Sequence, residues 1–410
     1  MTGIRMQCRG CHAVLEAPFL ELGAMPPANS YVRPEAVDVP EPDFPLSVYV
    51  CPSCWLVQVP EMLPPEAIFS HYAYLSGFSE VWRAHCAEYA RKMQQRLGLS
   101  TAHRVVEIAS NDGTLLKAFQ AHGVPVLGVE PAQNIAMQAN AQGIPTKAAF
   151  FGKETASAMV AEGQRADLIC ANNVLAHVPD MQDFLAGFKL LLQPEGMITF
   201  EFPHLLEMLL HTQFDTIYHE HFFYLSLTAL MPRFAEHGLQ VVDVQTLPTH
   251  GGSLRVFVQH AGAGMPSAAI QEVLEAENAA KITHMETYTA FARRTAQVRV
   301  AVRQALAQFQ QAGKRVAAYG APAKGNTMLN YCGVTAEQVV YTVDRNPEKQ
   351  GTLLPGSHIP VYAPEHLLQD QPDIVWILPW NIAGEVMQQM DVVRTWGGKF
   401  MTVMPDVRVW

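Results

Sequence analysis

The sequence has no excess of positive charge and no long apolar run. Of its 410 residues, 28 are Lys or Arg and 38 are Asp or Glu, which gives a formal net charge of −10. An acidic chain without a basic run is poorly suited to nucleic acid or to an anionic membrane. The start carries no apolar signal segment, and no apolar stretch is long enough to span a bilayer. We therefore expect a cytoplasmic protein that binds neither a nucleic acid polymer nor a membrane.

Cysteine is also scarce, and its distribution excludes a secreted disulfide framework. Four of the seven cysteines fall in two pairs and three are scattered. The pairs are Cys8-x-x-Cys11 and Cys51-x-x-Cys54, with 39 residues between Cys11 and Cys51. Two such turns are typical of a tetrahedral zinc site with four thiolates. Because that shell leaves no position for water, we predict a structural zinc. The alternative is four unligated, reduced thiols.

The length and the hydrophobic content predict several domains with ample cores. The chain has 410 residues, of which 49% are hydrophobic and 16% are charged. This is longer than a domain with a single hydrophobic core usually is. Alternating strand and helix patterns after the cysteine segment predict an α/β fold. We place a zinc-binding domain at residues 1–75, a second domain at 76–262 and a third at 263–410. The oligomeric state is not fixed by the sequence; our expectation is a monomer.

The second domain lacks the Gly-x-Gly-x-x-Gly loop that accepts a pyrophosphate. An apolar strand from Arg104 instead leads to Glu107 and then to Ala109-Ser110-Asn111-Asp112-Gly113. Carboxylates beside this loop disfavour a diphosphate and favour a cation with a free ammonium group, such as S-adenosylmethionine (SAM). The loop resembles the first motif of class I SAM-dependent methyltransferases. The alternative is a strand, loop and helix that bind no cofactor.

Two further strand ends are predicted to reach the same crevice. Glu130 ends the next strand, where an acid holds a ribose diol in nucleotide sites, and Asn172 and Asn173 end a later strand. The predicted cofactor-binding residues are Glu107, Ala109, Ser110, Asn111, Asp112, Glu130, Asn172 and Asn173.

The densest group of reactive side chains is Tyr218-His219-Glu220-His221. Neither histidine has a second histidine four positions further along the chain, so this is not an HExxH zinc helix. Imidazoles, a carboxylate and a phenol are suited to general acid–base chemistry. In an extended segment Tyr218 and Glu220 share a face, whereas in a helical turn Tyr218 and His221 share one. The position after the fifth strand favours function over a loop that only forms hydrogen bonds.

Tyr72 and Tyr74 precede an amphipathic helix expected from Ser79 to Leu97. They either pack against the zinc-binding domain or cover a ligand on the loop after Glu107. The sequence leaves both possibilities open.

The third domain repeats the pattern of strand, glycine loop and helix around Gly320-x4-Gly325. It is not a Walker A loop, because Lys324 precedes the second glycine. Free backbone N–H groups and one lysine favour an anion such as a sugar-nucleotide diphosphate. Plain structural glycines are the alternative. A nicotinamide cofactor is disfavoured by the glycine spacing, although Asp344 stands where a ribose acid belongs.

Taken together, the motifs resemble those of the zinc-containing C-methyltransferase family. The resemblance covers nearly the whole chain and rests on these elements: the two CxxC pairs, Glu-Ile-Ala-Ser-Asn-Asp-Gly, Asn-Asn-Val-Leu-Ala-His-Val, Tyr-His-Glu-His, His-Gly-Gly-Ser-Leu-Arg and Ala-Tyr-Gly-Ala-Pro-Ala-Lys-Gly-Asn. The best-known members methylate C-3 of thymidine-diphosphate-linked 4-keto deoxysugars. The resemblance implies a zinc-binding N-terminal domain, a Rossmann-like class I SAM-binding middle domain, and a Rossmann-like C-terminal domain that holds the nucleotide.

Residue roles follow from the resemblance, position by position. It implies that His221 is the general base, that His177 lies near the keto oxygen, and that a tyrosine ahead of the middle domain maps onto Tyr74 or, as the second choice, Tyr72. Tyr218, His219 and Glu220 complete the catalytic group, with Glu220 expected to orient a histidine. Contacts to the nucleotide sugar are assigned to Tyr319, Lys324, Asn326 and Arg255.

The predicted function is SAM-dependent C-methylation of a nucleotide-linked 4-keto deoxysugar through an enolate. One alternative is C-methylation of a different nucleotide sugar or of a ketone that is not a sugar. Another is a binding or scaffold protein with a vestigial SAM fold.

Overall fold

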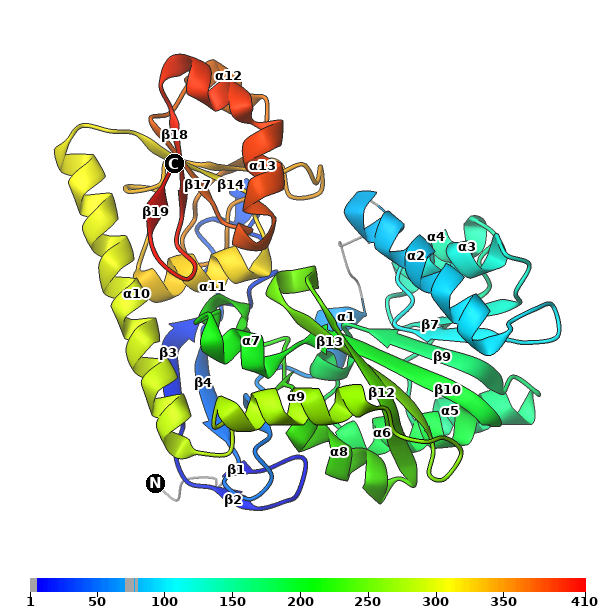
Figure 1. The fold of residues 1–410 in the computed structure, drawn as a ribbon. Helices are drawn as coiled ribbons and strands as arrows, with labels where there is room; N and C mark the ends of the chain where they lie inside the picture. Colours follow the sequence, from blue (N-terminus) through cyan, green and yellow to red (C-terminus); the bar gives the residue numbers. More distant parts are fainter. Residues whose placement is uncertain (1–5, 71–76, 78–79) are drawn as a thin grey trace.

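The computed structural model describes residues 6–70, residue 77 and residues 80–410, so Tyr72 and Tyr74 lie outside the described residues. Figure 1 shows an N-terminal unit and a C-terminal unit joined along one long helix, with the middle unit beside them. In the described part of the chain, no helix is both long and apolar enough to cross a membrane.

The N-terminal unit is built from short strands around the cysteine pairs. A two-stranded sheet and a four-stranded sheet, ordered β11-β5-β4-β3, contain these elements: β1 (Met6–Gln7), β2 (Val14–Leu15), β3 (Leu20–Met25), β4 (Phe44–Val50), β5 (Val57–Gln58) and β11 (Phe223–Tyr224), with the short helices η1 (Pro34–Ala36) and α1 (Pro65–Phe69). Strand β11 comes from far along the chain and begins two residues after His221.

The middle unit is a seven-stranded sheet ordered β12-β13-β10-β9-β6-β7-β8, in which β13 is antiparallel to both of its neighbours. Its strands are β6 (Val105–Ile108), β7 (Val126–Glu130), β8 (Thr146–Ala148), β9 (Ala166–Asn172), β10 (Leu192–Pro203), β12 (Leu239–Leu247) and β13 (Ser253–His260). The strand order reverses between β6 and β9, so a crevice is expected at their carboxyl ends. The antiparallel pair of β12 and β13 forms one edge of the sheet.

The helices of this unit connect and cover its sheet. They are α2 (Glu80–Leu97), α3 (Thr114–Gln120), α4 (Gln133–Ala141), α5 (Lys153–Ala161), η3 (Leu175–His177), α6 (Met181–Leu191), α7 (Leu205–Leu210), η4 (Phe214–Thr216), α8 (Leu227–Glu236) and η5 (Thr249–Gly251). Helix α2 packs against α3.

The C-terminal unit is a second Rossmann-like sheet, ordered β16-β15-β14-β17-β18-β19, and all its pairs are parallel except β18 with β19. Two helices lead into it, α9 (Ala268–Ala279) and α10 (Met285–Gln311). Its own elements are β14 (Val316–Tyr319), α11 (Ala323–Cys332), β15 (Thr342–Val343), β16 (Val361–Tyr362), α12 (His366–Asp370), β17 (Ile374–Ile377), η6 (Trp380–Ile382), α13 (Ala383–Gln389), η7 (Asp391–Trp396), β18 (Lys399–Thr402) and β19 (Arg408–Val409). The predicted fold class is confirmed in all three units.

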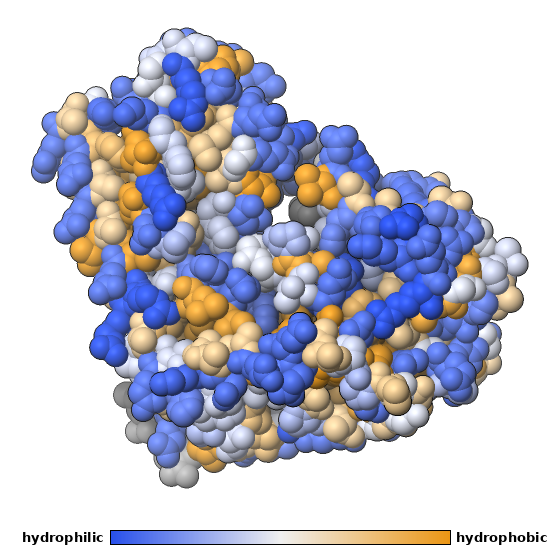
Figure 2. Space-filling view, in the orientation of Figure 1, coloured by the Kyte–Doolittle hydropathy of each residue, from blue (hydrophilic) through white to orange (hydrophobic). Residues whose placement is uncertain are grey.

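One hydrophobic core runs through the N-terminal and C-terminal units. Leu46 of β4, Tyr288 of α10 and Trp376 of β17 belong to the same buried cluster. Figure 1 shows α10 running along both units. Figure 2 shows a hollow between the lobe that carries the C-terminal unit and the lobe that carries α2.

Candidate active site

The loop after β6 makes the sharp turn that its small and polar residues predict. Ala109, Asn111 and Gly113 have positive φ values of 54°, 49° and 74°, a region that glycine and asparagine tolerate best. This turn leads into α3. The loop therefore lies at the carboxyl end of the central strand, beside the point where the strand order reverses.

Three carboxyl groups surround this loop, and all are buried. Glu107, Asp112 and Glu130 are 6%, 7% and 5% exposed. Burial raises the pKa of Glu107 well above its usual value, and the nearby charges of Asp112 and Glu130 raise it further. A cation bound here relieves that repulsion.

The polar atoms of this crevice that have no hydrogen-bond partner among the described residues fit SAM. Glu107 Oε2, Ser110 Oγ and the Oδ1 atoms of Asn172 and Asn173 are buried and form no hydrogen bond with the described residues. The carboxylate of Glu130 accepts the backbone N–H groups of Asn111 and Ala132, each at 2.9 Å, which ties β7 to the loop. The eight predicted cofactor residues thus come from the ends of β6, β7 and β9. When bound, SAM supplies an electrophilic methyl group.

The chain just before α2 reaches this loop. Gly77 N–H donates to Asp112 Oδ2 at 2.8 Å, and Arg83 Nη1 donates to the carbonyl of Gly77 at 2.5 Å. Gly77 thus lies at the cofactor loop, whereas the two possibilities stated for Tyr72 and Tyr74 concern residues outside those described.

Tyr218 and His221 form a hydrogen-bonded pair, as expected for a helical turn. Tyr218 Oη lies 2.8 Å from His221 Nε2, and His221 Nδ1 lies 2.9 Å from the carbonyl oxygen of Thr216. A carbonyl oxygen only accepts, so Nδ1 carries the hydrogen and Nε2 accepts from Tyr218. Burial, followed by the neighbouring His177, lowers the pKa of His221 well below its usual value. His221 is therefore a neutral imidazole whose Nε2 carries no proton.

His177 lies beside His221, at the end of η3. Their ring centroids are 4.6 Å apart. His177 Nδ1 donates to the carbonyl of Glu220 at 2.8 Å, and Phe222 N–H donates to the carbonyl of Ala176 at 2.7 Å. Burial lowers the pKa of His177 to about 4. The two histidines that were predicted to act on the acceptor are thus in direct contact, and their roles stay predictions.

Glu220 and His219 point toward the N-terminal unit. Asn29 Nδ2 donates to Glu220 Oε1 and Oε2 at 2.9 and 2.8 Å, and burial raises the pKa of Glu220 to about 7. His219 Nε2 lies 3.1 Å from the carbonyl of Phe44 in β4. The expectation that the Glu220 side chain orients a histidine is not met: its main-chain carbonyl holds His177, because the carboxyl group turns to Asn29.

The C-terminal unit contacts the other side of the same segment. Trp380 Nε1 donates to Asp215 Oδ2 at 2.6 Å, and Thr327 Oγ1 donates to the carbonyl of Ile217 at 2.8 Å. Burial raises the pKa of Asp215 to about 6. The segment from Phe214 to Tyr224, which we call the site loop, begins in the middle unit and ends in β11 of the N-terminal sheet, and it is held from both sides.

Three of the predicted substrate residues lie in the C-terminal unit. Lys324 Nζ donates to Asn381 Oδ1 at 2.7 Å and lies 4.7 Å from the centre of the Trp380 ring. Asn326 Nδ2 donates to the carbonyl of Ala28 at 2.7 Å. Tyr319 lines a cavity of about 200 Å³ at the carboxyl ends of β14, β15 and β17. Its lining includes Gly320, Asp344, Arg345 and Lys349.

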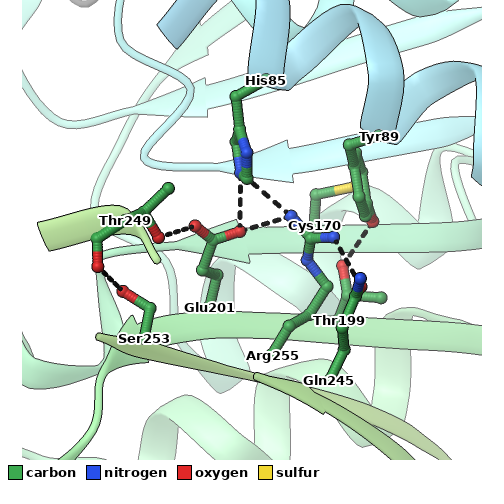
Figure 3. Close-up of polar contacts among 9 residues, drawn as sticks. All are labelled: His85, Tyr89, Cys170, Thr199, Glu201, Gln245, Thr249, Ser253 and Arg255. Atoms are coloured by element: carbon green, nitrogen blue, oxygen red, sulfur yellow. Dashed lines mark hydrogen bonds and ion pairs between the residues drawn. The ribbon is translucent and has the colours of Figure 1, made fainter. Parts of the chain in front are cut away.

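The fourth, Arg255, lies in a different place. Figure 3 shows its guanidinium group against Glu201, which also contacts His85 and Thr249. Arg255 Nη2 is 2.5 Å from Glu201 Oε2, and the two side chains are 4% and 0% exposed. Burial alone would raise the pKa of Glu201, but the hydrogen bond from His85 and the charge of Arg255 lower it to about 2. Arg255 thus neutralises a buried acid, and nothing in this geometry directs it to a substrate.

The four paired cysteines come together as predicted. The Sγ atoms of Cys8, Cys11, Cys51 and Cys54 all lie within 4.8 Å of one another. This donor set fits a tetrahedral zinc ion. The cysteines would hold the metal as thiolates and thereby fix the two turns that carry them.

The sequence reasoning missed three groups that the structure brings to the site. Asn29 lies in a proline-rich loop and carries no local signal, and Trp380 reaches Asp215 only through the packing of two units. Glu201 was detectable, because it stands at the carboxyl end of a buried strand, as Glu107 and Glu130 do.

An acid-lined loop at the reversal point of a seven-stranded sheet of this order defines a class I SAM-dependent methyltransferase. Comparison with known families agrees: residues 8–69 match a zinc binding domain, residues 82–244 a methyltransferase domain, and residues 248–405 a C-methyltransferase C-terminal domain. The chain is also 37% identical to the C-methyltransferase NovU of Streptomyces niveus over 404 residues, which cover 98% of this chain and 96% of that protein.

The chain therefore belongs to the zinc-containing C-methyltransferase family, and it is a SAM-dependent C-methyltransferase that acts on a small molecule. Two similar solved structures each align with less than half of it. A SAM-dependent methyltransferase from Clostridium acetobutylicum aligns with 43% of this chain and 91% of its own, at 11% identity and a TM-score of 0.35. Magnesium protoporphyrin IX methyltransferase from Synechocystis aligns with 44% and 82%, at 11% identity and a TM-score of 0.32.

Proposed function

We propose that the enzyme methylates C-3 of a nucleotide-linked 4-keto deoxysugar, with thymidine diphosphate as the carrier. The observation that supports this most directly is the buried pair of Tyr218 and His221 next to His177. A neutral imidazole held against a second imidazole is suited to removing a proton beside a carbonyl group, which is the step that methylation at carbon requires.

The proposed reaction starts with proton removal. Nε2 of His221 takes the proton from C-3 once Tyr218 releases its hydrogen bond to that nitrogen, and the C–H electrons move into the enolate of the 4-keto group. The enolate oxygen is stabilised by hydrogen-bond donors, for which Tyr218 and His177 are the candidates; His177 donates only when its Nε2 is protonated, because its Nδ1 hydrogen is held by the carbonyl of Glu220. The enolate carbon then forms a bond to the SAM methyl group, whose bond to sulfur breaks to leave a neutral thioether. Holding carbon and methyl in line contributes roughly 7–11 kcal/mol in well-oriented models.

The cavity in the C-terminal unit supports a nucleotide carrier. It opens at the carboxyl end of a Rossmann-like sheet, beside Gly320, and Arg345 and Lys349 line it. Cationic side chains and a glycine turn are suited to phosphate groups. Lys324 stands between this cavity's glycine loop and Asp215 of the site loop. A sugar linked to a diphosphate in the cavity would therefore be directed toward the site loop.

Incubation with SAM and a panel of acceptors tests the proposal. The panel contains thymidine- and uridine-diphosphate 4-ketosugars and simple cyclic ketones, and the product is read by mass for the gain of one methyl group. We expect methylation of a thymidine-linked 4-keto deoxysugar and loss of the C-3 proton signal. Methylation of the simple ketones alone would show that the acceptor is not a nucleotide sugar.

A further inference from the structure

The cysteine cluster is connected to the site loop through one buried side chain. Gln58 of β5 donates from Nε2 to Cys8 Sγ at 3.2 Å, and its Oε1 accepts the backbone N–H of Arg9 at 3.1 Å. Gln58 also pairs in register with Phe223 of β11. The same residue thus contacts a metal-ligand sulfur and the strand that ends the site loop.

Arg9, the residue after Cys8, makes a second connection. Its Nη2 donates to the carbonyl of Val59 at 3.0 Å, and its guanidinium carbon lies 5.1 Å from the ring centre of Phe222 and 5.6 Å from that of Phe223. Val59 N–H in turn donates to the carbonyl of Phe222 at 3.0 Å. Both phenylalanines are buried. Arg9 therefore packs on the end of the site loop and connects it to the turn that carries Cys8.

Phe222 is the residue through which both histidines are placed. It follows His221 directly, and its N–H bond to Ala176 fixes the residue that precedes His177. A shift of Phe222 would move His221 and break the contact that holds His177 beside it. Because a displacement of about 1 Å at reacting groups can lower a rate roughly 10²-fold, the side chain that fixes Phe222 affects catalysis without touching a substrate.

We propose that Arg9 is a positioning residue of the methyl-transfer reaction, which transmits the geometry of the metal-binding turn at Cys8 through Phe222 to His221 and His177. This inference rests on the proposed function to the extent that the two histidines carry out the chemistry. It gives the zinc-binding domain a part in the reaction, because the domain sets the position of the residues that act on the acceptor.

The variants R9Q and R9K test the proposal, with R165Q as the matched control. Arg165 also binds main-chain carbonyls, those of Leu190 and Leu192 at 2.7 and 3.1 Å, but it directly precedes β9 and lies beside the amino-terminal end of β10. All variants are assayed as full-length, zinc-loaded protein with SAM and a thymidine-diphosphate 4-keto-6-deoxyhexose. We expect R9Q to lower kcat about 10- to 100-fold, with the zinc content and the Kd for SAM unchanged. R9K should be intermediate, since lysine keeps the charge but loses the planar fork, and R165Q should match the native enzyme.

Hydrogen–deuterium exchange separates this proposal from the choice of acceptor. In the complex with S-adenosylhomocysteine, the peptide covering residues 214–224 should exchange faster in R9Q and R9K than in R165Q. A folded, zinc-loaded R9Q with native kcat and native exchange in this peptide would overturn the proposal. If no nucleotide sugar is methylated by the native enzyme, the exchange data alone decide it. If R9Q does not fold, R9K is judged by the same criterion.

Discussion

At the scale of single residues, burial determines the charge of the groups around the site loop. His177 and His221 are held neutral, whereas Glu220 retains its proton to unusually high pH, with a pKa raised to about 7 by burial. Neutral imidazoles are available as bases at physiological pH, and a protonated Glu220 is a hydrogen-bond donor.

Replacing Glu220 with Gln tests this assignment through stability. Between pH 4.5, the usual pKa of glutamate, and about 7, the unfolded chain releases this proton and the folded chain keeps it. The native enzyme therefore loses stability through this group as pH rises across that window, and the variant has no such loss. We expect the stability of E220Q relative to the native enzyme to increase between roughly pH 5 and pH 8. Urea unfolding at several pH values measures it. A pH-independent difference would contradict the buried, protonated carboxyl group.

A second residue-scale prediction concerns the buried ion pair in Figure 3. Glu201→Ala leaves Arg255 charged and without its partner in the core. We expect a loss of about 3–5 kcal/mol in the free energy of unfolding, as is usual when one member of a buried pair is removed. Glu162→Ala is the control, because Glu162 and Lys147 form an exposed pair whose contribution is expected to be small. An equal, small effect of both substitutions would contradict the account.

The residues around the site were predictable to the extent that their signal is local. Glu107, Glu130 and Asn172 each stand at the end of an apolar strand, and the reversal of strand order brings them together. Arg255 shows the limit. Its motif identified the family, but its partner Glu201 lies 54 residues away, and only packing reveals that the arginine neutralises a buried acid.

At the scale of elements, the turn between β12 and β13 connects the middle and C-terminal units. Gly251 has a positive φ of 88°, and a Cβ there would collide with the ring of Trp380. Its carbonyl accepts Gln213 Nε2 at 2.8 Å, next to the start of the site loop. A side chain at Gly251 must therefore displace either the turn or Trp380, which holds Asp215.

We predict that Gly251→Ala lowers methyl-transfer activity at least about tenfold, because misplacing the site loop affects the reacting geometry. SAM binding, measured by calorimetry, should stay near native, since Glu107 and Glu130 lie on β6 and β7, which do not pair with β12 or β13. Gly262→Ala is the control, as it has a similar φ of 84° but no atom within 4 Å of the added Cβ. Equal activity losses in both variants would point to backbone strain alone.

Helices and strands with a regular pattern of apolar residues were predictable from the sequence, whereas the pairing of strands from distant segments was not. The central strands of both Rossmann-like sheets, such as β6, β9, β14 and β17, read as apolar runs, and α2 was expected at nearly its observed bounds. Strand β11 has two residues, Phe223 and Tyr224, and pairs with Val57 and Gln58, more than 160 residues earlier in the chain. Two residues carry no periodicity, so the strand that ties the site loop to the zinc-binding domain was beyond sequence reasoning.

At the scale of the whole molecule, the three units meet at one segment. The site loop begins in the middle unit, Asn29 and Arg9 hold it from the N-terminal unit, and Trp380 and Thr327 hold it from the C-terminal unit. This arrangement separates two tasks. The cofactor loop is formed by the middle unit, whereas the groups proposed to act on the acceptor are set by all three.

Removing zinc is expected to impair methyl transfer while leaving SAM binding in place. Cys54→Ser opens the metal shell and loosens the turns around Cys8 and Cys51. We predict a loss of bound zinc and of most methyl-transfer activity, with SAM still bound, because Glu107 and Glu130 lie on other strands. Metal analysis and calorimetry measure the two quantities. Cys332→Ser, a buried cysteine outside the cluster, is the control. Loss of SAM binding together with zinc would show that the units are not separable in this way.

The central claim is that His221 removes a proton from the carbon that receives the methyl group. Its most direct test is deuterium exchange at C-3 of a thymidine-diphosphate 4-keto deoxysugar in D₂O, with S-adenosylhomocysteine bound so that methylation does not follow. The account predicts exchange by the native enzyme and by His122→Asn, an exposed control, and a rate about 10²- to 10⁴-fold lower for His221→Asn. Exchange at the native rate in folded His221→Asn would contradict it.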